Sequence, residues 1–269
     1  VNRLLVRKAI AEYAHEQLFS PQLLGAAERE GWQRYELAAD TEGCVYRFEA
    51  RTMALRHWHI EPASIERLLD GQPQALDALT FVIDFKRTLG IPADKLPVYL
   101  DEISSTLYGA AFKHCERALS SAELADADYQ TIEAAMIEGH PGFVANNGRL
   151  GFNAFDYHAY APETGSRFAI IWLAVHRDNA HFAAVPGLDH EQLLREELGE
   201  AQLQAYRQQL HEQGLNADDY LLMPTHPWQW FSKLSLMFAA DIAQRKIVPL
   251  GRSSDEYVAQ QSLRTYYNM

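Results

Sequence analysis

The segment at residues 139–152 constrains this chain more than any other stretch, because it places conformationally special residues beside polar side chains. Its sequence is Gly-His-Pro-Gly-Phe-Val-Ala-Asn-Asn-Gly-Arg-Leu-Gly-Phe. Pro141 fixes its own φ and biases the preceding residue toward extended geometry, while the glycines permit backbone conformations that other residues avoid. We predict a binding loop that directs its polar side chains at an anionic or carbonyl-rich ligand. Those side chains are His140, Asn146, Asn147 and Arg149.

Two further segments accompany this loop. They are Met-Pro-Thr-His-Pro-Trp-Gln-Trp at residues 223–230 and Gln-Ser-Leu-Arg-Thr at residues 261–265. In this order and spacing, the three segments resemble the motifs of the IucA/IucC family, the NRPS-independent siderophore synthetases. Residues 2–12 also resemble the N-terminal helix of the branch that makes hydroxamate siderophores. Phe143, Val144 and Asn147 stand where many members have a second His-Pro pair and a Lys.

The resemblance implies an ATP-dependent, AMP-forming carboxylate–amine ligase. Its expected substrate is a succinylated N-hydroxy-diamine of the cadaverine or putrescine type, whose carboxylate is adenylated and joined to the amine of another copy. ATP and Mg²⁺ are the expected cofactors, and the full-length enzyme is expected to be a homodimer. Because family members are about twice as long, we expect this chain to be an N-terminal half. Its metal ligands would then lie beyond Met269, and the chain alone would be inactive.

The resemblance also assigns roles to residues. ATP binding is expected from Ser262, Arg264, Thr265 and His140, and catalysis from His140 and Arg264. Substrate binding is expected from Arg149, Asn146, Asn147 and His226. These side chains suit the chemistry, because an arginine fork binds phosphate or carboxylate oxygens and a histidine near its pKa can donate to either. As alternatives, Arg264 could form a surface ion pair, and His226 could be a structural residue at a helix entry.

Composition excludes several classes of protein. The 269 residues are 48% hydrophobic, which is enough for one large domain or two small ones. The net charge of −12 argues against nucleic-acid binding, which depends on a basic face. The longest apolar run, at residues 168–175, is too short to span a bilayer, and the charged residues 1–20 are unlike a secretory signal. We expect a cytoplasmic protein without a membrane partner, in which Cys44 and Cys115 are buried free thiols.

Hydrophobic periodicity and capping signals predict an α+β fold. Helices are expected at residues 1–18, 97–119, 190–212 and 228–243, and strands within 43–60, 168–175, 181–185, 221–223, 246–250 and 257–262. The run at 168–175 lacks alternation and should be covered on both faces. In the helix at 190–212, Gly199 is a weak point and Gly214 the stop. A capping box at Ser120 and Glu123 opens one more helix, which leads through Ile132 and Met136. We expect a helical lobe with a small sheet at residues 1–137, followed by an antiparallel-sheet lobe flanked by helices at 138–269.

Several alternatives remain open at this level. Residues 139–152 could be a glycine-rich hairpin with incidental polar residues instead of a binding loop. They are not a P-loop, because the Gly-x4-Gly-Lys-Ser/Thr pattern is absent. His57 and His59 could bind a metal from one strand face, but no third ligand is evident, and we predict no metal site. The chain could also be a non-catalytic binding or scaffold half whose partner carries the chemistry. A metal-dependent hydrolase is disfavoured because His-Glu-x-x-His and Cys-x-x-Cys are absent.

Overall fold

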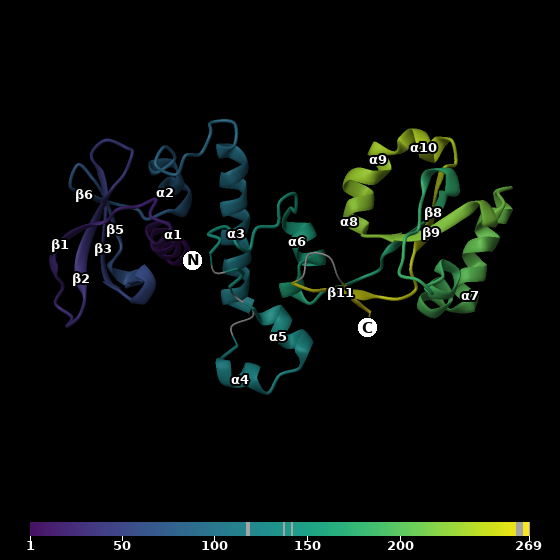
Figure 1. Cartoon of the computed structure of the whole chain (residues 1–269), viewed down its shortest axis with the longest axis horizontal. Helices are drawn as coiled ribbons and strands as arrows, with labels where there is room; N and C mark the ends of the chain where they lie inside the picture. The colour runs from purple at the N-terminus through teal and green to yellow at the C-terminus, as the bar shows by residue number, and fades with distance from the viewer. Residues whose placement is uncertain (117–118, 137, 141, 262–265, 269) are drawn as a thin grey trace. The chain divides into compact units, whose positions relative to one another are not determined.

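The computed structural model describes residues 1–116, 119–136, 138–140, 142–261 and the backbone of 266–268. The chain divides into two compact units, Val1–Asn153 and Ala154–Met269 (Figure 1). Helices and antiparallel sheets occur in both units, which confirms the predicted α+β class. The predicted division between residues 137 and 138 falls inside the first unit and stays a prediction.

The first unit is built on a six-stranded antiparallel sheet. In chain order, β1 to β6 are Gln22–Ala26, Gln33–Ala38, Cys44–Thr52, Trp58–Ile60, Glu66–Leu69 and Gln72–Gln74. The central strand β3 pairs with β2, β4 and β5. Alternate residues along β3 are buried, namely Cys44, Tyr46, Phe48 and Ala50. The region predicted at 43–60 therefore holds two strands, whereas the other four were not predicted because they are short or largely exposed.

Helices cover this sheet and extend from it. They are α1 (Asn2–His15), α2 (Ala78–Asp84), α3 (Leu96–Glu116), α4 (Ser121–Ala125) and α5 (Tyr129–Ala135). The first and third confirm the helices predicted at residues 1–18 and 97–119. The hydroxyl of Ser120 accepts from the N–H of Glu123, whose carboxylate accepts from the N–H of Ser120, so the predicted capping box is confirmed. The helix predicted to lead from it through Ile132 and Met136 is divided into α4 and α5, because Asp128 caps a new helix that ends at Ala135.

The buried face of α3 is partly polar. Ile103 lies on it at 1% exposure, and Thr106 at 2% and Lys113 at 0% lie on it as well. The neighbouring His114 is exposed. A fully buried lysine needs polar partners, because an unpaired buried charge is expensive.

A buried carboxylate links α2 to the sheet. Asp84 is 3% exposed. Its oxygens accept hydrogen bonds from the Tyr46 hydroxyl at 2.8 Å, the Thr41 hydroxyl at 2.8 Å and the Arg67 Nε at 2.7 Å. Burial raises the pKa of the Asp84 carboxyl, but these three donors outweigh burial and hold the pKa below its usual value. Asp84 is therefore ionised and fully bonded inside the first unit.

The second unit contains two three-stranded antiparallel sheets. One has the order β10 (Ile247–Arg252), β8 (Ile171–His176) and β9 (Tyr220–Thr225), and the other has the order β12 (Tyr266–Asn268), β11 (Tyr257–Ala259) and β7 (Arg167–Phe168). The helices are α6 (Ala154–Tyr160), α7 (His190–Glu212), α8 (Pro227–Gln229), α9 (Ser235–Met237) and α10 (Ala239–Ala243).

Strand β8 is covered on both faces, as predicted. Trp172 and Ala174 join an apolar cluster with residues of α7, while Leu173 and Val175 join a second cluster with Trp230. Figure 1 shows α7 on one side of β8 and β9 and the helices α8 to α10 on the other. Because both faces of β8 are buried, consecutive residues of this strand are apolar instead of alternating with polar ones.

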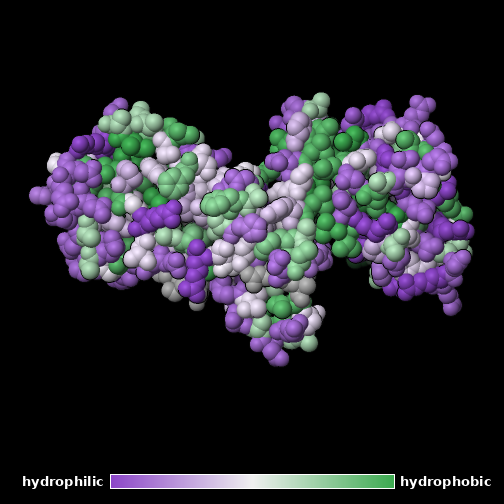
Figure 2. All heavy atoms as spheres, turned by 180° about the vertical axis from the view of Figure 1, so that it is seen from behind, coloured by the Kyte–Doolittle hydropathy of each residue, from purple (hydrophilic) through white to green (hydrophobic). Residues whose placement is uncertain are grey.

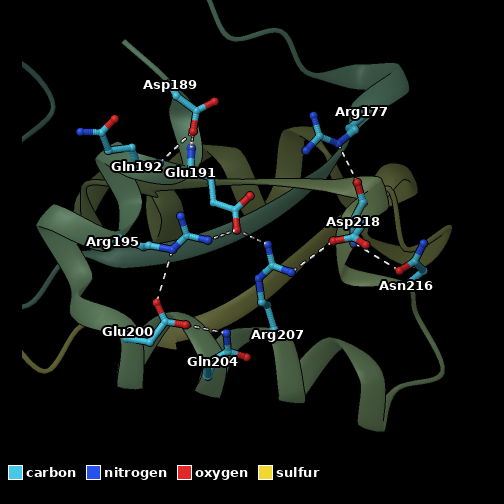
Figure 3. A network of polar contacts seen from close by, with 10 residues as sticks. All are labelled: Arg177, Asp189, Glu191, Gln192, Arg195, Glu200, Gln204, Arg207, Asn216 and Asp218. Atoms are coloured by element: carbon cyan, nitrogen blue, oxygen red, sulfur yellow. Dashed lines mark hydrogen bonds and ion pairs between the residues drawn. The ribbon is translucent and has the colours of Figure 1, made fainter. Parts of the chain in front are cut away.

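Helix α7 has the predicted bounds but bends at Gly199, where φ is 73° and ψ is 158°. Glu191 accepts from Arg195 at 2.8 Å and from Arg207 at 3.1 Å (Figure 3). In a straight helix, positions 191 and 207 would lie about 24 Å apart along the axis. The two segments therefore fold back toward each other, which confirms Gly199 as the weak point. Gly214, at φ 75°, follows the end of the helix as predicted.

Other predictions need correction. Residues 181–185 form no strand, and the helix predicted at 228–243 is a series of short pieces with a π-helical turn at Trp230–Leu234. Cys44 is a buried free thiol, and burial raises its pKa to about 11, but Cys115 is exposed. The helix carrying Cys115 ends one residue later, so its side chain is not covered there.

The surface carries exposed apolar side chains in both units (Figure 2). In the second unit, Phe231, Leu236 and Met237 are 58%, 76% and 70% exposed. Across the part of the chain that the structure describes, no helix has the length and apolar character needed to cross a bilayer.

Replacing the buried carboxylate tests its role. We expect Asp84→Asn to lower the free energy of unfolding by about 3 kcal/mol, because it leaves the Arg67 guanidinium, whose side chain is 12% exposed, without its counter-charge. The loss should shrink as pH falls below about 4, because a carboxyl with a lowered pKa stabilises the folded state only while it is ionised. Urea unfolding across this pH range measures both effects.

A surface pair in the same sheet provides the control. Glu36 binds Arg47 at 2.8 Å, with side chains 25% and 51% exposed. Glu36→Gln should cost less than about 1 kcal/mol. Equal losses for the two variants would contradict the structural role of Asp84.

Candidate functional site

The loop at residues 139–152 is closely packed in the first unit. A Cβ on Gly139 would lie 2.4 Å from the carbonyl oxygen of Asn146, and one on Gly148 would lie 3.3 Å from the carbonyl oxygen of Glu102 on α3. The backbone N–H of Arg149 donates to the Ser105 hydroxyl of α3 at 2.7 Å. A side chain at position 139 would therefore collide with the loop backbone, and one at position 148 would be tightly packed against α3.

A buried lysine fixes the two loop asparagines. The Lys113 ammonium donates to the side-chain oxygen of Asn147 at 2.8 Å and to the Met136 carbonyl at 3.0 Å. The Asn147 amide then donates to the Asn146 side-chain oxygen at 3.1 Å. Asn147 is only 6% exposed, so its side chain links the loop to α3. The sequence predicted Asn147 as a substrate ligand and missed Lys113.

A second lysine, from α1, meets the start of the loop. Lys8 donates to the Glu138 carboxylate at 3.3 Å and to the His140 carbonyl at 3.4 Å. Asn146 donates to the same two acceptors, each at 3.3 Å. The loop backbone is therefore held between α1 and α3 by two cationic side chains. Lys8 lies within the segment that resembles the family, but nothing in the sequence pattern pairs it with Glu138.

His140 itself is exposed at the loop surface. Its Nδ1 accepts from the N–H of Gly142 at 3.1 Å, and its ring lies 4.6 Å from that of Phe143, centre to centre. When Nδ1 accepts, a neutral ring carries its proton on Nε2. The structure thus joins the His140 carbonyl and the side chains of Asn146 and Asn147 in one hydrogen-bonded network. Arg149 of the same loop bonds to α3 through its backbone N–H.

His226, in the second unit, is a helix cap. Its Nδ1 accepts from the N–H of Trp228 at 3.1 Å, at the start of α8. Its ring lies 4.8 Å from those of both Tyr160 and Phe168, and burial lowers its pKa to about 4. The imidazole is neutral at pH 7, which supports the structural alternative for His226. Pro141, Ser262, Arg264 and Thr265 lie outside the described residues.

The described residues contain no group of three or more His, Cys, Asp or Glu side chains able to hold a metal. His57 stacks on His15 with ring centres 4.3 Å apart, whereas His59 accepts from Arg51 at 3.2 Å. The two histidines proposed for a shared strand face therefore have separate partners.

Comparison with known proteins identifies the class to which this loop and fold belong. Residues 128–269 match the IucA / IucC family, and the chain belongs to that family. It is 46% identical over 268 residues to putrebactin synthase of Shewanella sp. (strain MR-4), covering 100% of this chain and 42% of that protein. It is 31% identical to aerobactin synthase of Escherichia coli, covering 100% of this chain and 44% of that protein.

Solved structures show the same fold. Aerobactin synthetase IucC from a hypervirulent pathotype of Klebsiella pneumoniae gives a TM-score of 0.84 at 31% identity, covering 99% of this chain and 46% of that one. Petrobactin biosynthesis protein AsbB from Bacillus anthracis str. Sterne gives a TM-score of 0.85 at 27% identity, covering 100% and 44%. The chain spans less than half the length of these relatives.

The lowered pKa of His226 makes stability depend on pH. Because the folded pKa is about 4 and the ordinary value is 6.5, the unfolded state binds more protons between these values. The contribution is therefore complete above about pH 6.5 and is lost as pH falls toward 4. We expect wild type to lose up to about 2 kcal/mol over this range relative to His226→Asn, which keeps a capping acceptor but cannot be protonated.

Denaturant unfolding at several pH values measures this difference. His226→Ala is the control, because it should lose about 1 kcal/mol of capping energy without the pH dependence. Parallel pH profiles for wild type and His226→Asn would contradict a buried, neutral histidine.

Removing the Lys113 ammonium should loosen the loop. In Lys113→Met the buried side-chain oxygen of Asn147 and the partly buried carbonyl of Met136 lose a donor, at a cost of about 1 to 3 kcal/mol. We expect amide hydrogen exchange at residues 146–148 to accelerate at least about 10-fold, with little change in the β-sheet. Lys95→Met, at a lysine whose side chain is 71% exposed, should leave exchange unchanged. Unaltered exchange in Lys113→Met would show that the loop does not depend on this contact.

Proposed function

We propose that this chain forms the N-terminal part of an ATP-dependent hydroxamate siderophore synthetase. The enzyme would adenylate the carboxylate of a succinylated N-hydroxy-diamine and join it to an amine. The observation that carries this proposal is the 46% identity to putrebactin synthase along the whole chain. Rhizobactin siderophore biosynthesis protein RhbF of Rhizobium meliloti (strain 1021), 32% identical, supports a role in siderophore biosynthesis.

The chemistry explains why ATP is proposed. A carboxylate oxygen is a poor leaving group, and its attack on the α-phosphate of ATP forms an acyl adenylate and releases pyrophosphate. The amine then attacks the acyl carbon and AMP leaves. Catalysis depends mainly on orientation and on neutralising phosphate charge. The ATP-bound structure of aerobactin synthetase IucA from a hypervirulent pathotype of Klebsiella pneumoniae shares the fold, at 16% identity and a TM-score of 0.63.

The loop geometry refines the proposed residue roles. We keep His140 as a donor to carboxylate or phosphate, because it is exposed and Nε2 carries the proton of the neutral ring. Arg149 and Asn146 remain proposed substrate ligands, whereas Asn147 becomes a positioning residue because Lys113 holds it. The Lys113 ammonium, 2.8 Å from Asn147, brings positive charge to the position where many family members have Lys. His226 is better explained as a helix cap than as a substrate ligand.

The remaining assignments rest on the family resemblance. Ser262, Arg264 and Thr265 are the proposed ATP ligands, and Mg²⁺ would bind to parts of the full-length enzyme outside this chain. We further propose a cytoplasmic homodimer for the full-length protein.

The reaction products test the proposal. In a full-length protein containing this chain, we expect ATP to give AMP and pyrophosphate only when N-hydroxy-N-succinylcadaverine or its putrescine homologue is present. Arg264→Lys keeps the charge but loses the planar fork, so AMP formation should fall at least about 10-fold while the thermal midpoint stays within a degree or two. Product chromatography and thermal unfolding measure the two effects.

Other results would have clear meanings. Release of ADP and phosphate would remove adenylation from the proposal. Substrate binding without any ATP turnover would favour the alternative of a non-catalytic binding half. The lysine control Lys95→Met should leave AMP formation unchanged.

A further inference from the structure

A cavity of about 270 Å³ lies in the first unit beside the start of the loop. Its wall includes Arg7, Lys8 and Glu12 of α1, Trp58 and His59 of β4, and Glu138. This volume is near the lower end of the range for small-molecule pockets. The cavity can therefore hold a small metabolite.

Most polar groups of the wall already have partners. Lys8 and Glu138 bind each other at 3.3 Å, and His59 accepts from Arg51 at 3.2 Å. Among the charged groups of the wall, Arg7 and Glu12 differ, because their side chains make no hydrogen bond or ion pair to any residue that the structure describes. The Arg7 Nε is buried without a partner. A buried donor without a hydrogen bond is uncommon and costly. We therefore expect Arg7 to bind an acceptor that does not belong to the chain.

The two unpartnered groups have opposite charges. They lie five residues apart on α1, so their backbone positions are separated by about 7.5 Å along the helix axis. A ligand that satisfies both needs a carboxylate for Arg7 and an ammonium for Glu12, at opposite ends of a chain. An α-amino acid carries its charges on neighbouring atoms and fits this spacing poorly. The Trp58 ring supplies an apolar surface for the methylene groups between the charges.

We propose that this cavity binds a small ω-amino carboxylate, with its carboxylate on Arg7 and its ammonium on Glu12. The identity of the natural ligand rests on the proposed function, because a succinylated N-hydroxy-diamine has a carboxylate at one end and a primary amine at the other. Gly139 of the loop also lines the cavity, which places the bound molecule next to the loop. The site would hold a copy of the substrate before reaction.

Direct binding to the 269-residue chain tests this site without ATP. The probes are 6-aminohexanoate, hexanoate, 1-aminohexane and norleucine, followed through the indole N–H signal of Trp58 in nitrogen-15 NMR spectra. We expect saturable binding of 6-aminohexanoate and at least about 10-fold weaker binding of the other three, because each lacks one charge or has the wrong spacing. Arg7→Met and Glu12→Gln should each weaken 6-aminohexanoate binding by a similar factor.

Arg34→Met is the matched control, because Arg34 is an exposed arginine of β2 that does not line the cavity. It should leave binding within about 2-fold of wild type. No binding of 6-aminohexanoate at tens of millimolar, equal binding of hexanoate, or equal weakening by Arg34→Met would each overturn the proposal. The proposed function can fail independently, because ω-amino carboxylate binding here needs neither ATP turnover nor the rest of the enzyme.

Discussion

The candidate site depends on the hydrogen bond from the Lys113 ammonium group to the side chain of Asn147. Lys113 is fully buried in α3, and it reaches a loop 34 residues later in the chain. Its hydrogen bond orients Asn147, which orients Asn146, which meets the backbone carbonyl of His140. A buried charge persists only where polar partners surround it, so the loop must hold this geometry for α3 to remain packed. The same contact therefore serves both packing and site geometry.

A second buried charge organises the sheet of the same unit. Asp84 draws donors from three separate positions, and satisfying them fixes how α2 lies on the strands. Such networks add little net stability compared with apolar packing, but they penalise every arrangement that leaves one member unpaired. The first unit thus uses one buried anion and one buried cation to select a single packing of its helices.

The second unit reaches a defined fold by different means. Strand β8 lies between two apolar clusters, and α7 folds back at Gly199 so that both its segments can contribute to one of them. Charged side chains drawn in Figure 3 connect the two segments of this bent helix. His226 lies among these apolar side chains and caps α8 as a neutral imidazole. It therefore supplies no positive charge to an anionic ligand at pH 7.

The sequence by itself determined the features that depend on neighbours within a few residues. These are the α+β class, the bounds of α7, the capping box at Ser120, the two-sided burial of β8 and the glycine-rich loop of the family. Only the tertiary structure decided which polar groups meet. Lys8 and Glu138 are 130 residues apart in the chain, and periodicity carries no information about a partner at that distance. Their pairing follows from how α1 and the loop pack on the same core, and that is a property of the folded unit.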